Sequence, residues 1–242
     1  HLFTTVTARS HVMLGHFLVH YAAIGVRVTT NAHLLLHEDF ASTPTLDAAK
    51  DVCEKPGVRD VVLQPGVNST ELEFVKLRRL NALIRRLPDD AWVIFADADE
   101  MFDFPCDMLA QLERPGTARR SQQHAVCAFM QDRVADDFSV PFVRPTPSLA
   151  EQFPRCAKLR GLSSRSPVQA NILKIMLLRA RIHGRAPHFI NAHKIFVPPA
   201  DAGGRTFVVG GTPQTNNHCI FLPQRFSHYS LTREALSLAV RK

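Results

Sequence analysis

Apolar and polar segments alternate along the first hundred residues in a way that predicts strands followed by helices. The apolar residues of 2–7 predict a short strand, and those of 11–24 recur at helical spacing until Gly25 stops the helix. The β-branched and apolar residues of 26–36 predict a second strand, and 61–63 predicts a third, weaker one. This alternation is typical of an α/β domain with a parallel sheet.

The clearest predicted helix precedes the most apolar strand. Thr70 and Glu73 form a capping box at its start, and Pro88 ends it. The residues 91–96 that follow are a continuous apolar run, suited to the middle of a parallel sheet. We therefore expect right-handed βαβ units in a three-layer sandwich. The apolar face of this helix consists of Leu77, Leu80, Leu83, Ile84 and Leu87.

The second half of the chain is less regular. Strands are predicted at 125–130 and 172–178, separated by the Pro- and Ser-bearing stretch 139–169. A short terminal helix is predicted from Thr232 onward. No internal repeat is visible in the sequence.

The composition narrows the class of protein. The 242 residues carry 45% hydrophobic and 21% charged residues, as soluble globular proteins do. The net charge of +7 is spread along the chain, and a basic surface suits an enzyme with a diphosphate substrate as well as a protein without an anionic ligand. We expect no nucleic-acid partner, since no aromatic residues are interleaved with the basic ones. The basic helix positions Lys76, Arg78, Arg79, Arg85 and Arg86 are interpreted as a solvated surface.

The five cysteines are odd in number and form no Cys-x-x-Cys pair, so we expect neither a zinc site nor a disulfide framework, but buried apolar fillers. No apolar stretch approaches the ~20 residues that span a bilayer, and no signal peptide opens the chain. The chain begins at His1 rather than Met, as an excised domain would. Membrane association would then come through missing flanking segments. We expect the Golgi lumen for a eukaryotic chain with a missing N-terminal anchor, and the cytoplasm otherwise.

The string WVIFADADE, residues 92–100, delivers three acids at the end of a buried strand. Ligands of open α/β sheets bind at the carboxyl ends of the strands. Clustered carboxylates raise one another's pKa, whereas a hard divalent ion neutralises them. The pattern therefore predicts that Asp97 and Asp99 hold Mn²⁺ or Mg²⁺ against a diphosphate, which would stabilise a leaving nucleoside diphosphate during glycosyl transfer. The alternative is that both residues only cap a helix or solvate a loop.

Several segments resemble the glycosyltransferases of families 2 and 92, which have the GT-A fold. The resemblance covers most of the chain, although 186–225 matches poorly. His20, Tyr21 and Gly25 match a His-Tyr pair before a turn, although we interpret His20 as structural. The matching segments are HFLVHYAAIGV (16–26), RRLPDD (85–90), ADADEMF (96–102), QDRVADD (131–137), LAEQFP (149–154) and FSHYS (226–230).

This resemblance implies a GT-A-like α/β/α sandwich with a mixed, mainly parallel sheet. The whole chain, 1–242, would be one domain, with a nucleotide-sugar-binding half at 1–103 and an acceptor-binding half with the C-terminal segment at 104–242. The family's late histidine, which completes the metal or diphosphate site, corresponds to His228. The implied nucleotide contacts are the loop Thr7, Ala8 and Arg9, with Asp97 at the diphosphate and Asp39 near the base or ribose. Ser10 and His11 stand where the family often has Asn-Glu.

Asp132 is a candidate general base that removes the proton from an attacking hydroxyl. An ordinary salt bridge with Arg133 is the alternative. Inversion at the sugar carbon needs such a base, and the preference for inversion comes only from the resemblance.

The sequence thus predicts a metal-dependent transferase that moves a sugar from a nucleotide-diphosphate donor to a hydroxyl of a glycan, lipid or protein. One rival is a nucleotidyltransferase on a related fold, which would carry a Gly-rich basic loop after the first strand, unlike residues 7–11. The other is a non-catalytic basic module that binds glycan or nucleic acid.

Overall fold

The computed structural model describes eleven stretches of the chain. They are 1–38, 43–65, 69–105, 124–137, 141–157, 173–182, 184–191, 194–197, 207–209, 219–221 and 226–229.

The first half of the chain alternates strands with helices and builds a parallel sheet in the order β3-β2-β1-β4. Its strands are β1 (Leu2–Thr7), β2 (Ala32–Glu38), β3 (Asp60–Pro65) and β4 (Trp92–Phe95). Its helices are η1 (Ala8–Ser10), α1 (His11–Ala23), α2 (Val28–Asn31), α3 (Thr43–Glu54) and α4 (Ser69–Arg86). The predicted βα pattern of this half is confirmed, and α3 is an additional helix that the sequence analysis did not include.

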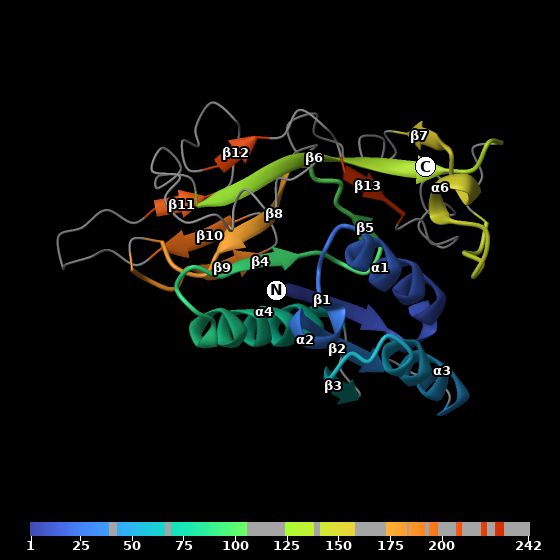
Figure 1. Ribbon diagram of the computed structural model, residues 1–242, viewed down its shortest axis with the longest axis horizontal. Coiled ribbons are helices and arrows are strands. Elements are labelled where there is room, and N and C mark those ends of the chain that lie inside the picture. The colour runs from blue at the N-terminus through green and yellow to red at the C-terminus, as the bar shows by residue number, and fades with distance from the viewer. Residues whose placement is uncertain are drawn as a thin grey trace.

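The second half extends the same sheet in mixed directions, as Figure 1 shows. The order continues from β4 through β8, β6 and β13 to β5, and β7 and β12 also pair with β6. These elements are β5 (Glu100–Met101), β6 (Ala125–Val134), α6 (Leu149–Gln152), β7 (Arg155–Ala157), β8 (Leu173–Arg179), β12 (Cys219–Phe221) and β13 (Phe226–His228). A separate antiparallel sheet contains β9 (His188–Asn191), β10 (Lys194–Val197) and β11 (Phe207–Val209).

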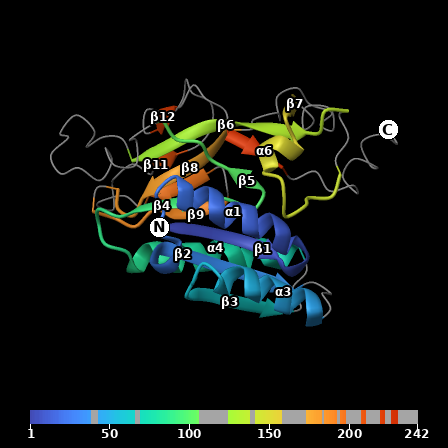
Figure 2. The same ribbon diagram turned by 45° about the vertical axis from the view of Figure 1, so that its right-hand side comes forward.

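Helices cover both faces of the parallel half, because each strand is apolar on both sides. Leu2 and Val6 of β1 point to the core that α1 and α3 complete, whereas Phe3 points to the core under α4. In Figure 2, α1 and α3 lie in front of the strands and α4 behind them. The Asn81 side chain of α4 bonds both backbone groups of Phe189, at 2.8 and 3.1 Å, which fixes the small sheet against this helix. The expected α/β sandwich with a mixed sheet is confirmed.

Two expectations need correction. The segment 26–36 is not one strand, since Thr30 and Asn31 donate their N–H groups to Arg27 O and close a helical turn before β2 begins. The cysteines are not all unpaired fillers, because Cys127 is disulfide-bonded, while Cys53 and Cys156 are free. The helix expected from residue 232 lies outside the described residues.

The described helices include none with the length and apolarity needed to cross a bilayer.

Candidate active site

The three acids form a tight turn where β4 leaves the sheet. Ala96 still bonds Phe3 O of β1, at 3.3 Å, so the turn begins at the carboxyl edge of the parallel strands. Glu100 N donates to Asp97 O, and Asp97 N donates to the Glu100 carboxylate, both at 2.9 Å. We call residues 97–100 the acid turn. Its position at this edge agrees with the prediction for a ligand site.

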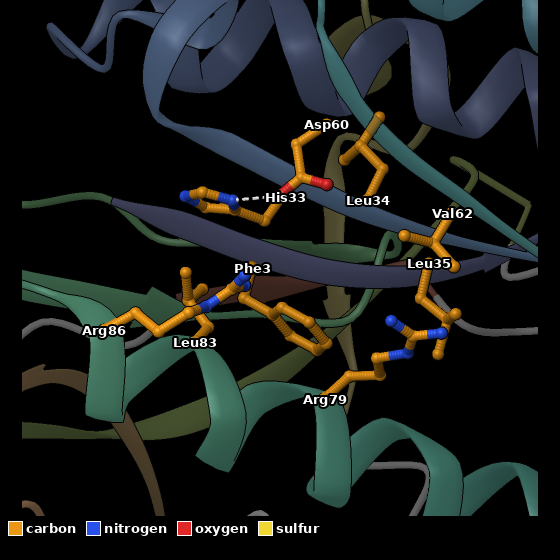
Figure 3. Close-up of a pocket in the computed structure, with 9 residues that line it drawn as sticks. All are labelled: Phe3, His33, Leu34, Leu35, Asp60, Val62, Arg79, Leu83 and Arg86. Carbon is orange, nitrogen blue, oxygen red and sulfur yellow. Dashed lines mark hydrogen bonds and ion pairs between the residues drawn. The ribbon is translucent and has the colours of Figure 1, made fainter.

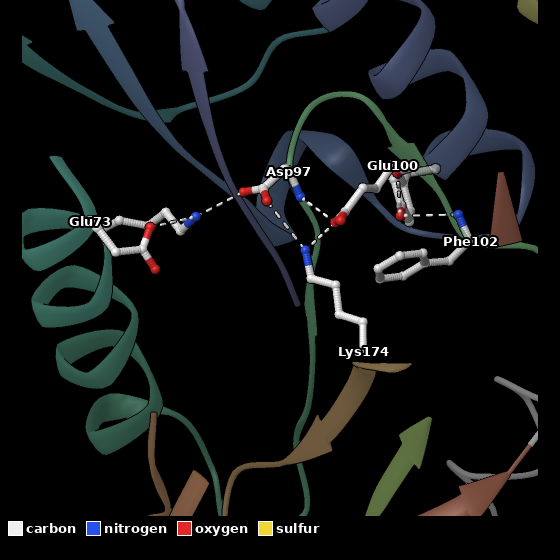
Figure 4. A network of polar contacts seen from close by, with 7 residues as sticks. Glu73, Asp97, Glu100, Phe102 and Lys174 are labelled. Carbon is white, nitrogen blue, oxygen red and sulfur yellow. Dashed lines mark hydrogen bonds and ion pairs between the residues drawn. The ribbon is translucent and has the colours of Figure 1, made fainter. Parts of the chain in front are cut away.

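Two lysines from distant parts of the chain hold the acid turn (Figure 4). Lys76 of α4 donates to Asp97 Oδ1 at 3.0 Å and also pairs with Glu73 at 3.0 Å. Lys174 of β8 donates to Asp97 Oδ2 at 3.3 Å and contacts the Glu100 carboxylate. In this structure, ammonium groups therefore pair with Asp97 and Glu100.

Both lysines are buried on the same side of the sheet. Lys76 is 8% and Lys174 2% exposed, and each Nζ lies 5.2 Å from the centre of the Phe95 ring. A desolvated ammonium gains stabilisation from the face of an aromatic ring. Buried charges of this kind are tolerated only when they are paired, so the lysines and the acids depend on each other.

The ion pairs shift the pKa values of the whole network. Burial by itself raises the pKa of Asp97, but Lys174 and Lys76 outweigh it and hold this pKa well below its ordinary value. Burial raises the pKa of Glu100, against the opposing effect of Lys174. For Lys76, burial lowers the pKa, yet Asp97 and Glu73 outweigh it and raise the pKa to about 12. Asp97 and Lys76 are therefore both charged at neutral pH.

The backbone that follows the acid turn is fixed by α1 and β13. The Tyr21 hydroxyl donates to Glu100 O at 3.1 Å and accepts from Phe102 N at 3.3 Å. His20 Nε2 lies 3.0 Å from Phe102 O, which agrees with the structural role expected for this histidine. Tyr229 N donates to Asp99 O at 2.8 Å. The turn is thus held from three sides, and a substrate would meet a preorganised surface.

The strand pairing brings two of the predicted site positions, His228 and Asp132, together beside Glu100 of the acid turn. In β13, His228 pairs with Glu100 of β5 on one side and with Asp132 of β6 on the other. Neighbouring strands lie about 4.8 Å apart, so these backbones are adjacent although they come from distant parts of the sequence. Asp132 is buried, at 4% exposure. The His228 side chain lies outside the described atoms, so its role stays a prediction.

The predicted nucleotide loop lies at the same edge, where β1 ends beside β4. Thr7 Oγ1 lies 3.0 Å from Ser10 Oγ, and Arg9 is exposed in η1. Nearby, Thr5 Oγ1 and His37 Nδ1 are buried and have no hydrogen-bond partner among the described residues. Buried polar atoms without partners are costly, and a polar ligand would satisfy them. Asp39, the other predicted nucleotide contact, lies outside the described residues.

The described residues do not fit a divalent cation at Asp97. Both of its carboxylate oxygens already accept from ammonium groups, so a metal would have to displace a lysine. Within the stretches that the structure describes, no three His, Cys, Asp or Glu side chains form a group suited to a metal. The metal roles of Asp97, Asp99 and His228 therefore stay predictions from the sequence.

Lys76 and Lys174 are the site residues that the sequence analysis missed. The interpretation of Lys76 as part of a solvated surface is wrong, because this side chain is buried against Asp97. A signal was available, since Lys76 stands four residues before Leu80 and seven before Leu83, on the apolar face of the helix. No comparable local signal marks Lys174, which lies 77 positions from Asp97.

Comparisons with known proteins give only distant likenesses. No family model and no curated protein sequence matches the chain. Among solved structures, TarS of S. aureus is 12% identical over 99% of this chain and 38% of its own, with a TM-score of 0.43. TarS 1–349 in complex with UDP-GlcNAc is 12% identical over 99% of this chain and 64% of its own, with a TM-score of 0.36. The galactosyltransferase LgtC is 10% identical over 76% of this chain and 59% of its own, with a TM-score of 0.32.

The chain spans 46% of the length of an LgtC mutant and of a TarS 1–349 structure that it also matches. These neighbours are glycosyltransferases, but membership of family 2 or 92 is not confirmed. At such distances no residue role transfers, and the site is argued from its own geometry.

Proposed function

We propose that this chain is a glycosyltransferase that moves a sugar from a nucleotide-diphosphate donor to an acceptor hydroxyl. The observation that carries the proposal is the preorganised acid turn at the carboxyl edge of the parallel strands, beside the loop 7–10. Thr5 Oγ1 and His37 Nδ1, which are buried and have no hydrogen-bond partner among the described residues, lie on the neighbouring strands β1 and β2 that lead to this edge.

The lysine pair lowers the electrostatic repulsion between this edge and an anionic donor. Glu73 and the three acids of the turn would repel a diphosphate, and Lys76 and Lys174 reduce this repulsion by bringing two positive charges to the turn. The Asp97 side chain remains 35% exposed. Its carboxylate can therefore still accept a hydrogen bond from a ribose or sugar hydroxyl. The ion pairs also fix the position of Asp97, because its two oxygens are held by different elements, α4 and β8.

The finer features rest on the sequence. Metal dependence, with Mn²⁺ or Mg²⁺, is proposed from the Asp-x-Asp motif alone, and Asp99 and His228 are the positions to test for it. Inversion at the sugar carbon, with Asp132 as the general base, rests on the family resemblance. Because Asp132 is buried, the acceptor hydroxyl would have to reach into the sheet to meet it. The division into a donor half (1–103) and an acceptor half (104–242) belongs to the same proposal. The acceptor is a glycan, lipid or protein hydroxyl.

The test is a donor-hydrolysis and transfer assay across a panel of UDP- and GDP-sugars, with and without Mn²⁺. We expect release of the nucleoside diphosphate by the parent, and a loss of at least about 100-fold in Asp99→Asn. Asp47→Asn, at an exposed ion pair on α3, is the matched control and should retain full activity. Release of pyrophosphate from a nucleoside triphosphate would indicate the nucleotidyltransferase instead. Binding of glycan or RNA without turnover of any donor would indicate the non-catalytic module.

The disulfide at Cys127 favours an oxidising compartment, because such bonds rarely persist in the cytosol. We therefore propose the secretory route, in line with the Golgi lumen expected for a eukaryotic chain. Peptide mapping of the native protein without reductant should find Cys127 in a disulfide-linked peptide and the exposed Cys156 as a free thiol. Recovery of Cys127 as a free thiol would contradict this proposal.

A further inference from the structure

A small pocket lies between α4 and the amino-terminal ends of β1, β2 and β3, as Figure 3 shows. Its volume is about 140 Å³. It faces the same side of the sheet as the lysine pair but lies toward the opposite ends of the strands, where Phe3, His33 and Asp60 contribute to its wall. No function proposed above uses it.

Two arginines of α4 point into this pocket. Arg79 and Arg86 are seven residues apart, two turns of helix, so both stand on the same face. Figure 3 shows both side chains extending from α4 toward the strands. Both are exposed, and within the described part of the chain neither takes part in an ion pair or hydrogen bond. Their guanidinium groups are therefore available to a ligand.

The acid in the pocket does not neutralise these arginines. Asp60 Oδ2 lies 2.5 Å from His33 Nδ1, so its carboxylate is engaged by the imidazole. Besides this pair, the charged groups that line the pocket are the two arginines, and they leave it with a net positive charge. An anion is the ligand that this charge favours.

The rest of the pocket is apolar and small. Phe3 and Leu83, each 4% exposed, form part of its wall. A cavity of about 150 Å³ accommodates benzene, whereas pockets for drug-sized ligands start near 300 Å³. The pocket therefore has room for an apolar group about the size of one aromatic ring.

We propose that this pocket binds a compact organic oxyanion, a phosphate monoester or a carboxylate with an apolar body of about one ring. The oxyanion lies between Arg79 and Arg86, whose planar forks match phosphate and carboxylate oxygens. The apolar body lies against Phe3 and Leu83. This site is separate from the donor site and does not depend on the proposed transferase activity.

The same helix provides a matched control. Arg78 and Arg85 are also exposed and also seven residues apart, but neither lines the pocket. A merely basic helix would attract anions through all four arginines alike. A specific anion site in the pocket would depend on Arg79 and Arg86 alone.

The test is calorimetric titration at 150 mM salt with phenyl phosphate, benzoate and, as a neutral analogue, benzyl alcohol. We expect at least one anion to bind, at least tenfold weaker binding by the double variant R79Q/R86Q, and unchanged binding by R78Q/R85Q. Thermal unfolding verifies that both double variants are folded, and unchanged donor hydrolysis in R79Q/R86Q separates this site from the active site. Failure of both anions to bind, equal binding of benzyl alcohol, or equal losses in the two double variants would overturn the proposal.

Discussion

Helix α4 carries positive charge in two different settings. Lys76 is buried and bonded to Glu73 and Asp97, whereas Arg79 and Arg86 are exposed and line a pocket, with no ionic partner in the part of the chain that the structure describes. All three were predicted to lie on a solvated surface. The difference shows that the environment decides whether a charge holds the protein together or remains available for a ligand.

The paired lysines should matter for stability and the unpaired arginines should not. A buried charge that loses its partner retains the full cost of its desolvation. An exposed charge is solvated in both the folded and the unfolded state, so its removal changes little. Four substitutions test this contrast.

The largest effect is expected for Lys174→Met. This change leaves the buried Glu100 carboxylate and Asp97 Oδ2 without their ammonium donor. We expect the free energy of unfolding to fall by about 3–5 kcal/mol, measured by urea denaturation at pH 7. The control Lys50→Met removes a surface pair with Asp47 and should cost less than about 1 kcal/mol. Equal losses in the two variants would mean that the buried network adds nothing to stability.

A smaller effect is expected for Lys76→Met, and it should depend on pH. The pKa of Lys76 is raised from 10.5 to about 12 by Asp97 and Glu73, which corresponds to about 2 kcal/mol of stability. Because the folded pKa lies above the unfolded one, this contribution is fully present below pH ~10 and is lost as the pH rises toward 12. The difference in unfolding free energy between parent and variant should therefore narrow from pH 9 to pH 11.5. A difference that stays constant over this range would contradict the assigned ion pairs.

The smallest effect is expected for Arg79→Gln and Arg86→Gln. Neither side chain has an ionic partner among the described residues, so each change should alter the unfolding free energy by less than about 0.5 kcal/mol. Urea denaturation under the conditions used for Lys174→Met gives the comparison. A loss near that of Lys174→Met would show that these arginines are structural.

The local part of the fold could be predicted from the sequence. The apolar and β-branched residues of 2–7 predict a strand, the apolar run 91–96 predicts a strand buried on both faces, and the 3.6-residue period predicts the helix α4. The place of the acid turn follows from the same rules. Helix α3 was missed although the sequence carries its signal, since Leu46, Ala49 and Cys53 recur at the three- and four-residue spacing of one helix face and pack on the core.

The neighbours of the acids on β8 and β13 could not be predicted, because they are brought there by long-range strand pairing. Lys174 reaches Asp97 only because β8 is inserted antiparallel beside β4, and His228 meets Glu100 only through β13. Clustered acids call for positive charge, and the structure supplies lysines to Asp97 and Glu100, one of them 77 positions from Asp97. The metal predicted from the same acids stays a prediction.

If the carboxyl edge of the sheet, and not the pocket at Arg79 and Arg86, binds the nucleotide-diphosphate donor, a bound nucleotide should protect the backbone at that edge alone. Hydrogen–deuterium exchange of the protein with and without UDP or GDP, followed by peptide mass spectrometry, measures this protection. We expect slower exchange in residues 5–10 and 96–102 and no change in residues 79–86. Slower exchange confined to residues 79–86, or none anywhere at saturating nucleotide, would contradict it.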